Sequence, residues 1–450
     1  MTKHIPKPSL GIILTQKQQF RAWFRSDFTK ELKLNYNVSF FIESESYSES
    51  SVYDETINLV SIPTKPKSDI KIMENTLISH KDWPSFQRRV KVHSNTYKNE
   101  LMELNIFKSP FTYYRFLIRF LSFKLRCLSR FCLHFSQKRL KKQILKTSPL
   151  LPRKDLFILV SNMNDFVNES FVSFLENSGI PWIQVVENWD NLSSKLCPSK
   201  KSHKLLVWGN QTKHHAVSIH NIKDSQIQTI GSLRLLDMKS LEALNKNTYK
   251  KAQTNFFYIG CGGEYENLEW IDQIYKTISS SVLGTNFTFT FRPHPNSIKR
   301  YGKDFYFSWP TYINLNLPTR GSKGQSDWPD LNVSLYGDLL KADLVIGSPS
   351  TFLIEALQFQ KYIILDIRDD GDKINSPAIN FKEYTHLAEI YNDDSFERFE
   401  NTMELENLLN NVEFKTKKRM QILDFLLFNN YETYAFRLSK QIDELLSVKR

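Results

Sequence analysis

The chain has 450 residues, a length that suits two domains of about 200 residues each rather than a single core. Hydrophobic residues make up 41% of the chain and charged residues 24%, a composition that excludes a largely disordered protein. Its four cysteines form no CxxC pair, which argues against zinc and iron–sulfur sites and indicates a reducing compartment.

The sequence contains no segment that predicts secretion or a membrane-spanning helix. The apolar run near the N-terminus, Leu10 to Leu14, is too short for a signal peptide. Nowhere does an uncharged apolar run reach the roughly 18 residues that a spanning helix needs. We therefore expect a cytoplasmic protein.

Strands and helices alternate through the first half of the chain. Apolar runs of strand length occur at residues 9–14, 37–42, 57–62, 156–161, 182–187, 204–208 and 226–230. Helical patterns fall between several of them, at residues 16–33, 166–178 and 212–220. Strands separated by helices are typical of βα units, so we expect a parallel sheet.

A polar stretch at residues 236–254 suits a linker, and the alternation resumes after it. Further strands are predicted at residues 255–260, 286–291, 343–347 and 362–366. Helices are predicted at residues 266–281, 350–359, 401–411, 416–429 and 431–448. The second half therefore predicts another parallel sheet covered by helices.

The predicted fold is α/β, with two doubly wound Rossmann-like domains that face a central cleft. We expect an N-terminal, acceptor-side domain over residues 1–240 and a nucleotide-donor-binding domain over residues 250–430. The helix within residues 431–450 is expected to cross back to the first domain. Ligands of such sheets bind beyond the carboxyl ends of the strands, and the functional residues are expected there.

One segment of the first domain is strongly basic. Residues 104–150 contain no acidic residue, and thirteen Lys and Arg fall between Leu104 and Lys154, which accounts for the whole net charge of +12. Within residues 111–146, arginines recur at helical spacing among Phe and Leu, a pattern typical of a helix on an anionic membrane surface. A core or dimer helix and an RNA-binding arm are the alternatives. Since the rest of the chain is near neutral, we expect no nucleic acid partner.

The sharpest motif is GSPSTFLIEAL, which follows a predicted strand at Gly347 and opens a helix. Backbone N–H groups at a helix start favour an anion, and the hydroxyls of Ser348, Ser350 and Thr351 add donors for phosphate. Glu355 lies one turn further on the same face and is suited to accept from sugar or ribose hydroxyls. An ordinary Ser/Thr helix cap is the alternative.

A second motif, FRPHP, follows the strand at residues 286–291. Arg292 and His294 there suit a diphosphate and the charge that develops on a leaving nucleotide, unless the turn is only structural. Gly262 and Gly263 follow the first strand of the same domain, where glycine lets the backbone approach a phosphate.

A third motif, ENWDNLSSK, follows the strand at residues 182–187 in the first domain. Asp190 is the candidate general base that deprotonates an acceptor hydroxyl, and an Asx turn is the alternative. Four neighbours are expected on the acceptor side, namely Asn188, Trp189, Asn191 and Lys195.

The order of these motifs resembles that of bacterial surface-polysaccharide enzymes of GT-B architecture, and is distantly similar to the CDP-glycerol glycerophosphotransferase family. That family has a Trp-His-Gly-Thr-x-x-Lys element where this chain has WDNLSSK at residues 189–195. Its Arg-x-His-Pro element is met by residues 292–295, and its Asp-Tyr-Ser-Ser turn corresponds loosely to residues 348–351. The resemblance implies the superfamily over most of residues 150–400.

The departures from that family favour transfer of a sugar. Asp190 replaces the family's His, Asn191 replaces its Gly, and Glu355 continues the helix as in sugar-nucleotide enzymes. The resemblance thus implies a glycosyltransferase that moves a sugar from a nucleotide-sugar to a glycan or lipid-linked glycan of capsule or O-antigen type. The alternatives are a CDP-polyol phosphotransferase and a non-catalytic GT-B-like subunit.

No cofactor is expected beyond the nucleotide-sugar substrate. The acidic run at residues 366–372 lacks the spacing of an established metal site, so no divalent metal is expected either. With the basic segment on lipid, the protein is predicted to be peripheral on the inner face of the cell membrane.

Overall fold

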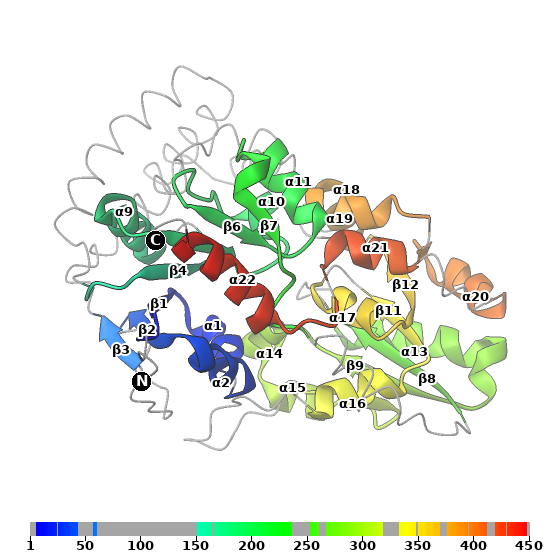
Figure 1. The fold of residues 1–450 in the computed structure, drawn as a ribbon. Coiled ribbons are helices and arrows are strands. Elements are labelled where there is room, and N and C mark those ends of the chain that lie inside the picture. Colours follow the sequence, from blue (N-terminus) through cyan, green and yellow to red (C-terminus); the bar gives the residue numbers. More distant parts are fainter. Residues whose placement is uncertain are drawn as a thin grey trace, which may run out of the picture. The chain divides into compact units, whose positions relative to one another are not determined.

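The structure is a computed structural model that divides into two compact units (Figure 1). It describes residues 6–24, 26–43, 57–60, 151–163, 166–235, 253–260, 267–317, 333–347, 350–369, 376–394, 396–411, 419–428 and 430–447. Unit 1 contains the described residues up to Arg234 and those after Leu426, and unit 2 contains the described residues from Leu235 to Leu426. The basic segment at residues 104–150, with Gly262, Gly263 and Ser348, lies outside the described residues.

Unit 1 is built on a parallel sheet of seven strands in the order β3-β2-β1-β4-β5-β6-β7. These are β1 (Ser9–Leu14), β2 (Asn37–Glu43), β3 (Ile57–Val60), β4 (Leu156–Ser161), β5 (Trp182–Val186), β6 (Lys204–Val207) and β7 (Ile227–Thr229). Leu10 of β1 pairs with Val38 on one side and Leu156 on the other. The strand order therefore reverses between β1 and β4.

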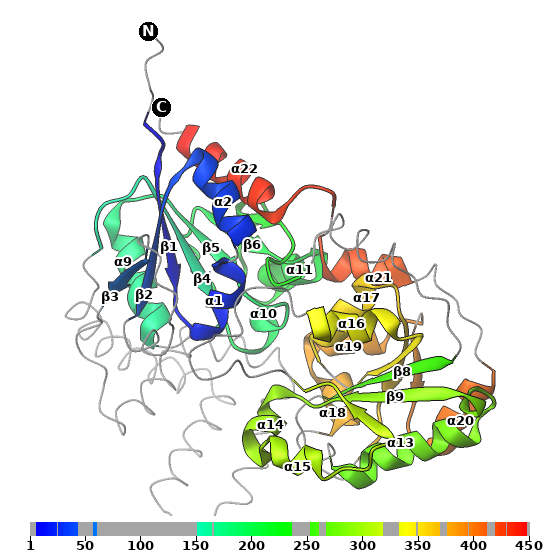
Figure 2. The same cartoon turned by 90° about the horizontal axis from the view of Figure 1, so that it is seen from below.

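Helices cover both faces of this sheet (Figure 2). They are α1 (Lys17–Trp23), α2 (Ser26–Asn35), α9 (Phe166–Ser178), α10 (Asn191–Ser194), α11 (Asn210–Ser218) and α22 (Tyr434–Ser447). The C-terminal α22 packs beside α2, where Tyr434, Leu438 and Ile442 recur every four residues and are buried in the core of unit 1. The hydroxyl of Tyr36 donates to Asp443 Oδ1 at 2.7 Å. The last helix is thus part of the first sheet's core.

Unit 2 repeats the same topology with a parallel sheet of six strands, in the order β10-β9-β8-β11-β12-β13. These are β8 (Thr254–Ile259), β9 (Phe287–Arg292), β10 (Ile313–Leu315), β11 (Leu344–Gly347), β12 (Tyr362–Asp366) and β13 (Glu397–Phe399). Here the order reverses between β8 and β11. Two doubly wound units are therefore present, as the sequence predicts.

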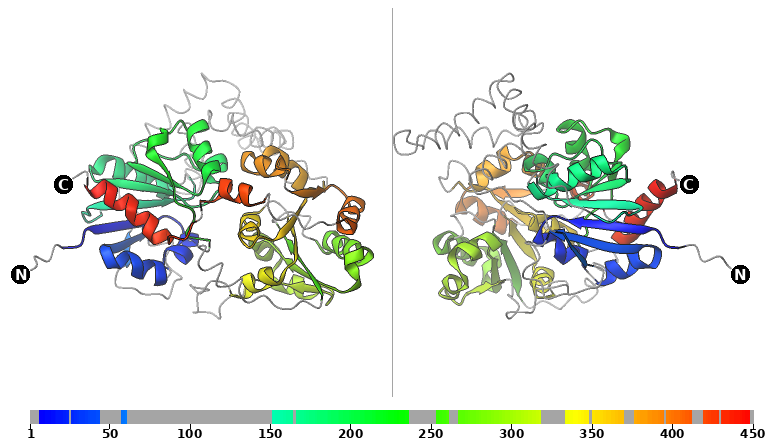
Figure 3. Two further views of the ribbon diagram at one scale, coloured as in Figure 1. Left: turned by 45° about the vertical axis from the view of Figure 1, so that its right-hand side comes forward. Right: turned by 90° about the vertical axis from the view of Figure 1, so that its left-hand side faces the viewer.

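The helices of unit 2 also lie on both faces of its sheet (Figure 3). They are α13 (Leu268–Ser280), α14 (Pro295–Tyr301), α15 (Lys303–Phe307), α16 (Val333–Lys341), α17 (Phe352–Gln358), α18 (Pro377–Glu383), α19 (Thr385–Tyr391), α20 (Thr402–Asn410) and α21 (Arg419–Leu426). A Cβ added at Gly347 would lie 2.0 Å from Leu353 Cδ2, so glycine lets α17 pack directly against the end of β11.

The predicted helix at residues 16–33 is wrong in one respect, because two helices, α1 and α2, take its place. Within the residues that the structure describes, every helix is too short or too polar to cross a bilayer.

Candidate functional site

The carboxyl ends of the unit 2 strands bring the predicted donor residues to one edge of the sheet. Arg292 ends β9, Gly347 ends β11, and α17 begins at Phe352. Strands β8 and β11 flank the reversal of strand order, the position where doubly wound sheets bind ligands. The sequence prediction that these motifs follow strand ends is confirmed.

Arg292 is fixed in place by contacts from two other elements. Its Nη1 donates to the side-chain oxygen of Asn316, and Asn316 Nδ2 donates to Asp338 Oδ2 at 2.7 Å. The guanidinium also lies 5.2 Å from the centre of the Phe352 ring, the first residue of α17. Arg292 therefore lies beside the start of α17, and its orientation is set before any ligand binds.

His294 lies two residues after Arg292 and is largely enclosed. Burial, together with the positive charge of Arg292, lowers the pKa of His294 below its ordinary value. The imidazole is therefore neutral at pH 7. Its backbone carbonyl accepts from Ser297 N at 2.9 Å, which ties the residue to the first turn of α14.

The start of α17 carries the two described hydroxyl residues of the GSPST motif. Ser350 Oγ accepts from the backbone N–H of Phe352 at 3.2 Å, a local contact beside the N-cap residue of the helix, Thr351. Thr351 directly precedes the helix, and the half-buried Glu355 lies one turn further. Glu355 and Thr351 are four residues apart and share a helix face.

A buried ion pair stabilises the same edge of the sheet. Asp366 ends β12, and Arg368 Nη2 donates to its Oδ2 at 2.8 Å, while the Tyr258 hydroxyl donates at 2.7 Å. The Arg368 guanidinium lies 3.8 Å from the centre of the Trp270 ring. Because Asp366 is occupied in this way, the start of the acidic run is structural. Among the described residues, no three His, Cys, Asp or Glu side chains are arranged to hold a metal ion.

In unit 1, an amide network joins the carboxyl ends of three strands. Asn162 follows β4, and its Nδ2 donates to Gln16 Oε1 at 2.7 Å in the loop after β1. The fully buried Asn191 donates to Asn162 and accepts from the backbone N–H of Asn188. The Asn191 side chain thus holds the loops together. Trp189 is buried as well. The acceptor-side role of these two residues stays a prediction, and sequence spacing gave no sign of their burial.

Asp190 lies between these two buried residues and reaches the surface. Its Oδ2 is 3.1 Å from Lys195 Nζ and accepts from Ser194 Oγ at 3.2 Å, and its side chain is 20% exposed. The structure thus brings Asp190 and Lys195 together as an ion pair. The carboxylate is oriented by these contacts.

A second carboxyl group, that of Glu187, lies directly after β5. It is only 6% exposed, and burial raises its pKa to about 7, while the nearby Arg234 charge and a hydrogen bond from Trp23 act in the opposite direction. In the sequence Glu187 is only the next candidate base after Asp190, and its raised pKa could not be predicted, because Trp23 of α1 and Arg234 are both distant from it along the chain.

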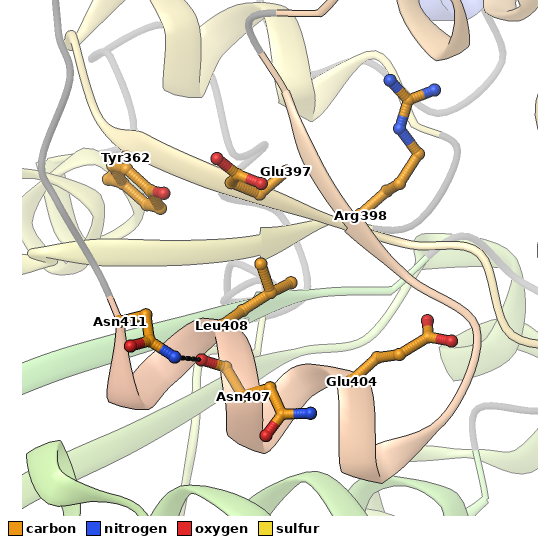
Figure 4. A pocket seen from close by; sticks show the side chains of 7 residues that line it. All are labelled: Tyr362, Glu397, Arg398, Glu404, Asn407, Leu408 and Asn411. Atoms are coloured by element: carbon orange, nitrogen blue, oxygen red, sulfur yellow. Dashed lines mark hydrogen bonds between the residues drawn. The ribbon is translucent and has the colours of Figure 1, made fainter.

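A polar hollow of about 630 Å³ lies at the opposite edge of the unit 2 sheet (Figure 4). Tyr362 and Glu397, which begin β12 and β13, line it together with Glu404, Asn407 and Asn411 of the α20 region. It is therefore separate from the residues at the carboxyl edge.

No protein-family model matches the sequence, and no curated protein matches it. Solved structures do match over both units. The putative UDP-N-acetylglucosamine 2-epimerase from Listeria monocytogenes has a TM-score of 0.51 at 10% identity, and the match covers 98% of this chain and 97% of that chain. UGT89C1 from Arabidopsis thaliana, solved with UDP-L-rhamnose, has a TM-score of 0.50 at 11% identity and covers 98% of both chains.

The fold is GT-B. The predicted resemblance to GT-B glycosyltransferases is confirmed at the level of fold only, because sequence identities near 10% show similarity of fold and not of function. The more specific similarity to the CDP-glycerol glycerophosphotransferase family stays a prediction.

Proposed function

We propose that this protein is a glycosyltransferase, which moves a sugar from a nucleotide-sugar donor to a glycan or lipid-linked glycan in capsule or O-antigen synthesis. The observation that carries the proposal is the preorganised Arg292, held by Asn316 and Phe352 beside the start of α17. An oriented guanidinium at the ligand-binding edge of a doubly wound sheet suits a diphosphate.

Unit 2 is proposed to hold the donor. Arg292 binds the diphosphate and takes up the negative charge that develops when the bond to the sugar breaks. His294, neutral at pH 7, donates a hydrogen bond to the same group, and Thr351 and Ser350 contact it at the start of α17. Glu355 accepts from a sugar or ribose hydroxyl, and Gly262, Gly263 and Ser348 complete this site.

Unit 1 is proposed to hold the acceptor and the general base. The acceptor hydroxyl attacks the anomeric carbon, its proton passes to Asp190, and the nucleotide diphosphate leaves. We favour Asp190 over Glu187 because Asp190 is accessible, whereas Glu187 is enclosed. Lys195 orients Asp190 through their ion pair. Asn188 would contact the acceptor from the same loop.

The site would work on the cytoplasmic face of a membrane, with residues 111–146 bound to anionic lipid. No resident cofactor or divalent metal takes part in the proposed reaction.

A thermal-shift screen followed by product analysis tests the function. UDP-, GDP-, CDP- and dTDP-linked sugars and CDP-glycerol are added separately, and a ligand of the folded state raises the unfolding temperature. We expect one nucleotide-sugar to be selected and its nucleotide to be released when acceptor glycans are added.

Selection of CDP-glycerol would favour polyol-phosphate transfer. An altered sugar on an intact donor would favour epimerisation, the reaction named for the Listeria structure. Binding without any product would favour a non-catalytic subunit.

A further inference from the structure

The α14–α15 segment of unit 2 has one aromatic side in the core and another in solvent. Tyr306 and Trp309 are buried, and the Trp309 ring stacks on Phe291 with 5.3 Å between centroids. Phe291 directly precedes Arg292, so the segment is fixed to the strand that carries the donor residue. Its exposed side chains are therefore presented from a rigid support.

Three other rings of this segment are exposed. Phe307 is 66% exposed, and Tyr301 and Phe305 are 39% and 37% exposed. Tyr301 and Phe305 stack with 5.0 Å between centroids, and they form one continuous ring surface. Neighbouring exposed rings mark binding surfaces more often than single exposed apolar residues do.

Basic side chains accompany these rings. The Arg300 guanidinium lies 5.8 Å from the centre of the Tyr301 ring, and Lys303 begins α15. Asp304 is the one acidic residue between Arg300 and Phe307. Arg300, Tyr301, Lys303, Phe305 and Phe307 are referred to below as the α14–α15 patch.

We propose that the α14–α15 patch binds the surface of an anionic lipid bilayer. Aromatic rings favour the boundary between headgroups and acyl chains, and Lys and Arg beside them are attracted by anionic headgroups. This contact is separate from the basic segment at residues 111–146, because it belongs to unit 2. It would also keep the donor residues near a lipid-linked acceptor, a consequence that rests on the proposed function.

The test is partition of the full-length chain onto phosphatidylcholine vesicles with and without phosphatidylglycerol. Phe307→Ser combined with Tyr301→Ser should lower the partition coefficient on anionic vesicles about tenfold, because less ring area leaves water. Arg300→Glu combined with Lys303→Glu leaves every ring in place and should lower it at least as much on anionic vesicles only. The matched control is Val282→Ser combined with Met403→Ser, two apolar residues of unit 2 that are 69% and 70% exposed, which should change nothing.

Thermal unfolding of each variant shows whether it is folded. If the double serine variant fails to fold, the double glutamate variant still tests the proposal, because it leaves the buried rings unchanged. Any contribution of residues 111–146 is the same in all variants and cancels in the ratio of coefficients. Unchanged binding in the folded patch variants would overturn the proposal. So would an effect on self-association alone, measured by ultracentrifugation, which would assign the patch to a second copy of the chain.

Discussion

The two sheets have the same strand order through six strands, yet their carboxyl edges carry different chemistry. In unit 2 the edge presents Arg292 and a neutral His294 beside the start of α17. In unit 1 it presents an amide network and two carboxyl groups, those of Asp190 and Glu187. The proposed function assigns one edge to an anionic donor and the other to a neutral hydroxyl compound that must lose a proton. The topology fixes where ligands bind, and the side chains at the strand ends determine which ligand.

The largest effect is expected for Asp190, at the carboxyl edge of the unit 1 sheet. Asp190→Asn should lower transfer by about 10³-fold or more, because the amide cannot accept the acceptor's proton. Steady-state kinetics with donor and acceptor would measure this loss. Donor binding should stay near that of the wild type, since the donor is proposed to bind unit 2.

Two further variants complete this test. Lys195→Met removes the partner of Asp190 but leaves the base in place, so it should retain part of the activity. If Asp190→Asn remains fully active, the base lies elsewhere, and Glu187→Gln is the next variant to measure.

At the carboxyl edge of unit 2, Arg292→Ala and His294→Ala should each lower turnover by about 10²-fold. A hydrogen-bond donor to the charge that develops in the reaction contributes a few kcal/mol. Arg398→Ala is the matched control. That arginine lies on β13, the outermost strand of the same sheet, and its guanidinium donates to the Tyr391 carbonyl. If Arg292→Ala and His294→Ala are both folded and have near wild-type kinetics, the turn that carries Arg292 and His294 is only structural.

A separate effect is expected on membrane binding through the basic segment. Changing Arg115, Arg119, Arg126 and Arg130 to Glu should strongly weaken binding to anionic vesicles, because each basic residue contributes about 1 kcal/mol at such a surface. Any binding that remains should come from the α14–α15 patch. Binding of wild type should fall with added salt. Activity on a soluble acceptor should survive. A folded, active variant that binds lipid at low salt as tightly as the wild type would contradict this interpretation, whereas loss of soluble expression would point to a core helix.

Glu187 gives a pH-dependent prediction on stability. Its pKa is about 7 in the folded protein against 4.5 in the unfolded chain, so the folded state binds more protons between these values. The free energy of unfolding should therefore fall as the pH rises from about 4.5 to about 7. Above this window Glu187→Gln should be more stable than wild type by up to about 3 kcal/mol.

Denaturant unfolding at pH 5 and pH 8 measures the difference in stability between Glu187→Gln and wild type, with a change of the exposed Glu397, Glu397→Gln, as control. Equal stability of Glu187→Gln and wild type at pH 8 would contradict the raised pKa.

Much of the fold follows from apolar runs in the sequence. The ranges of β1, β4 and β12 match the predicted strands residue for residue. By contrast, β10 and β13 are missed, because a three-residue strand at or near the edge of a sheet needs no apolar run. The helix predicted over residues 16–33 breaks near residue 25, where no proline or glycine marks the end.

The site was less predictable than the fold. Sequence order places Arg292 and Thr351 at strand ends, because the carboxyl ends of parallel strands share one edge. It does not reveal that Asn316 fixes Arg292 or that Asn191 is buried between two loops, since both contacts join residues at least 24 apart along the chain. Such partners depend on how the loops fold over the sheet edge.

Calorimetric titration of nucleoside diphosphates into the full-length protein tests the central claim most directly. UDP, GDP, CDP and dTDP are titrated separately into the wild type, Arg292→Ala and Arg398→Ala. We predict that one of them binds the wild type and Arg398→Ala equally, and binds Arg292→Ala at least about tenfold more weakly, because a charge-assisted contact to the diphosphate is lost. Equal affinity in Arg292→Ala, or no binding of any of the four to the wild type, would contradict the assignment of the unit 2 edge as a donor site.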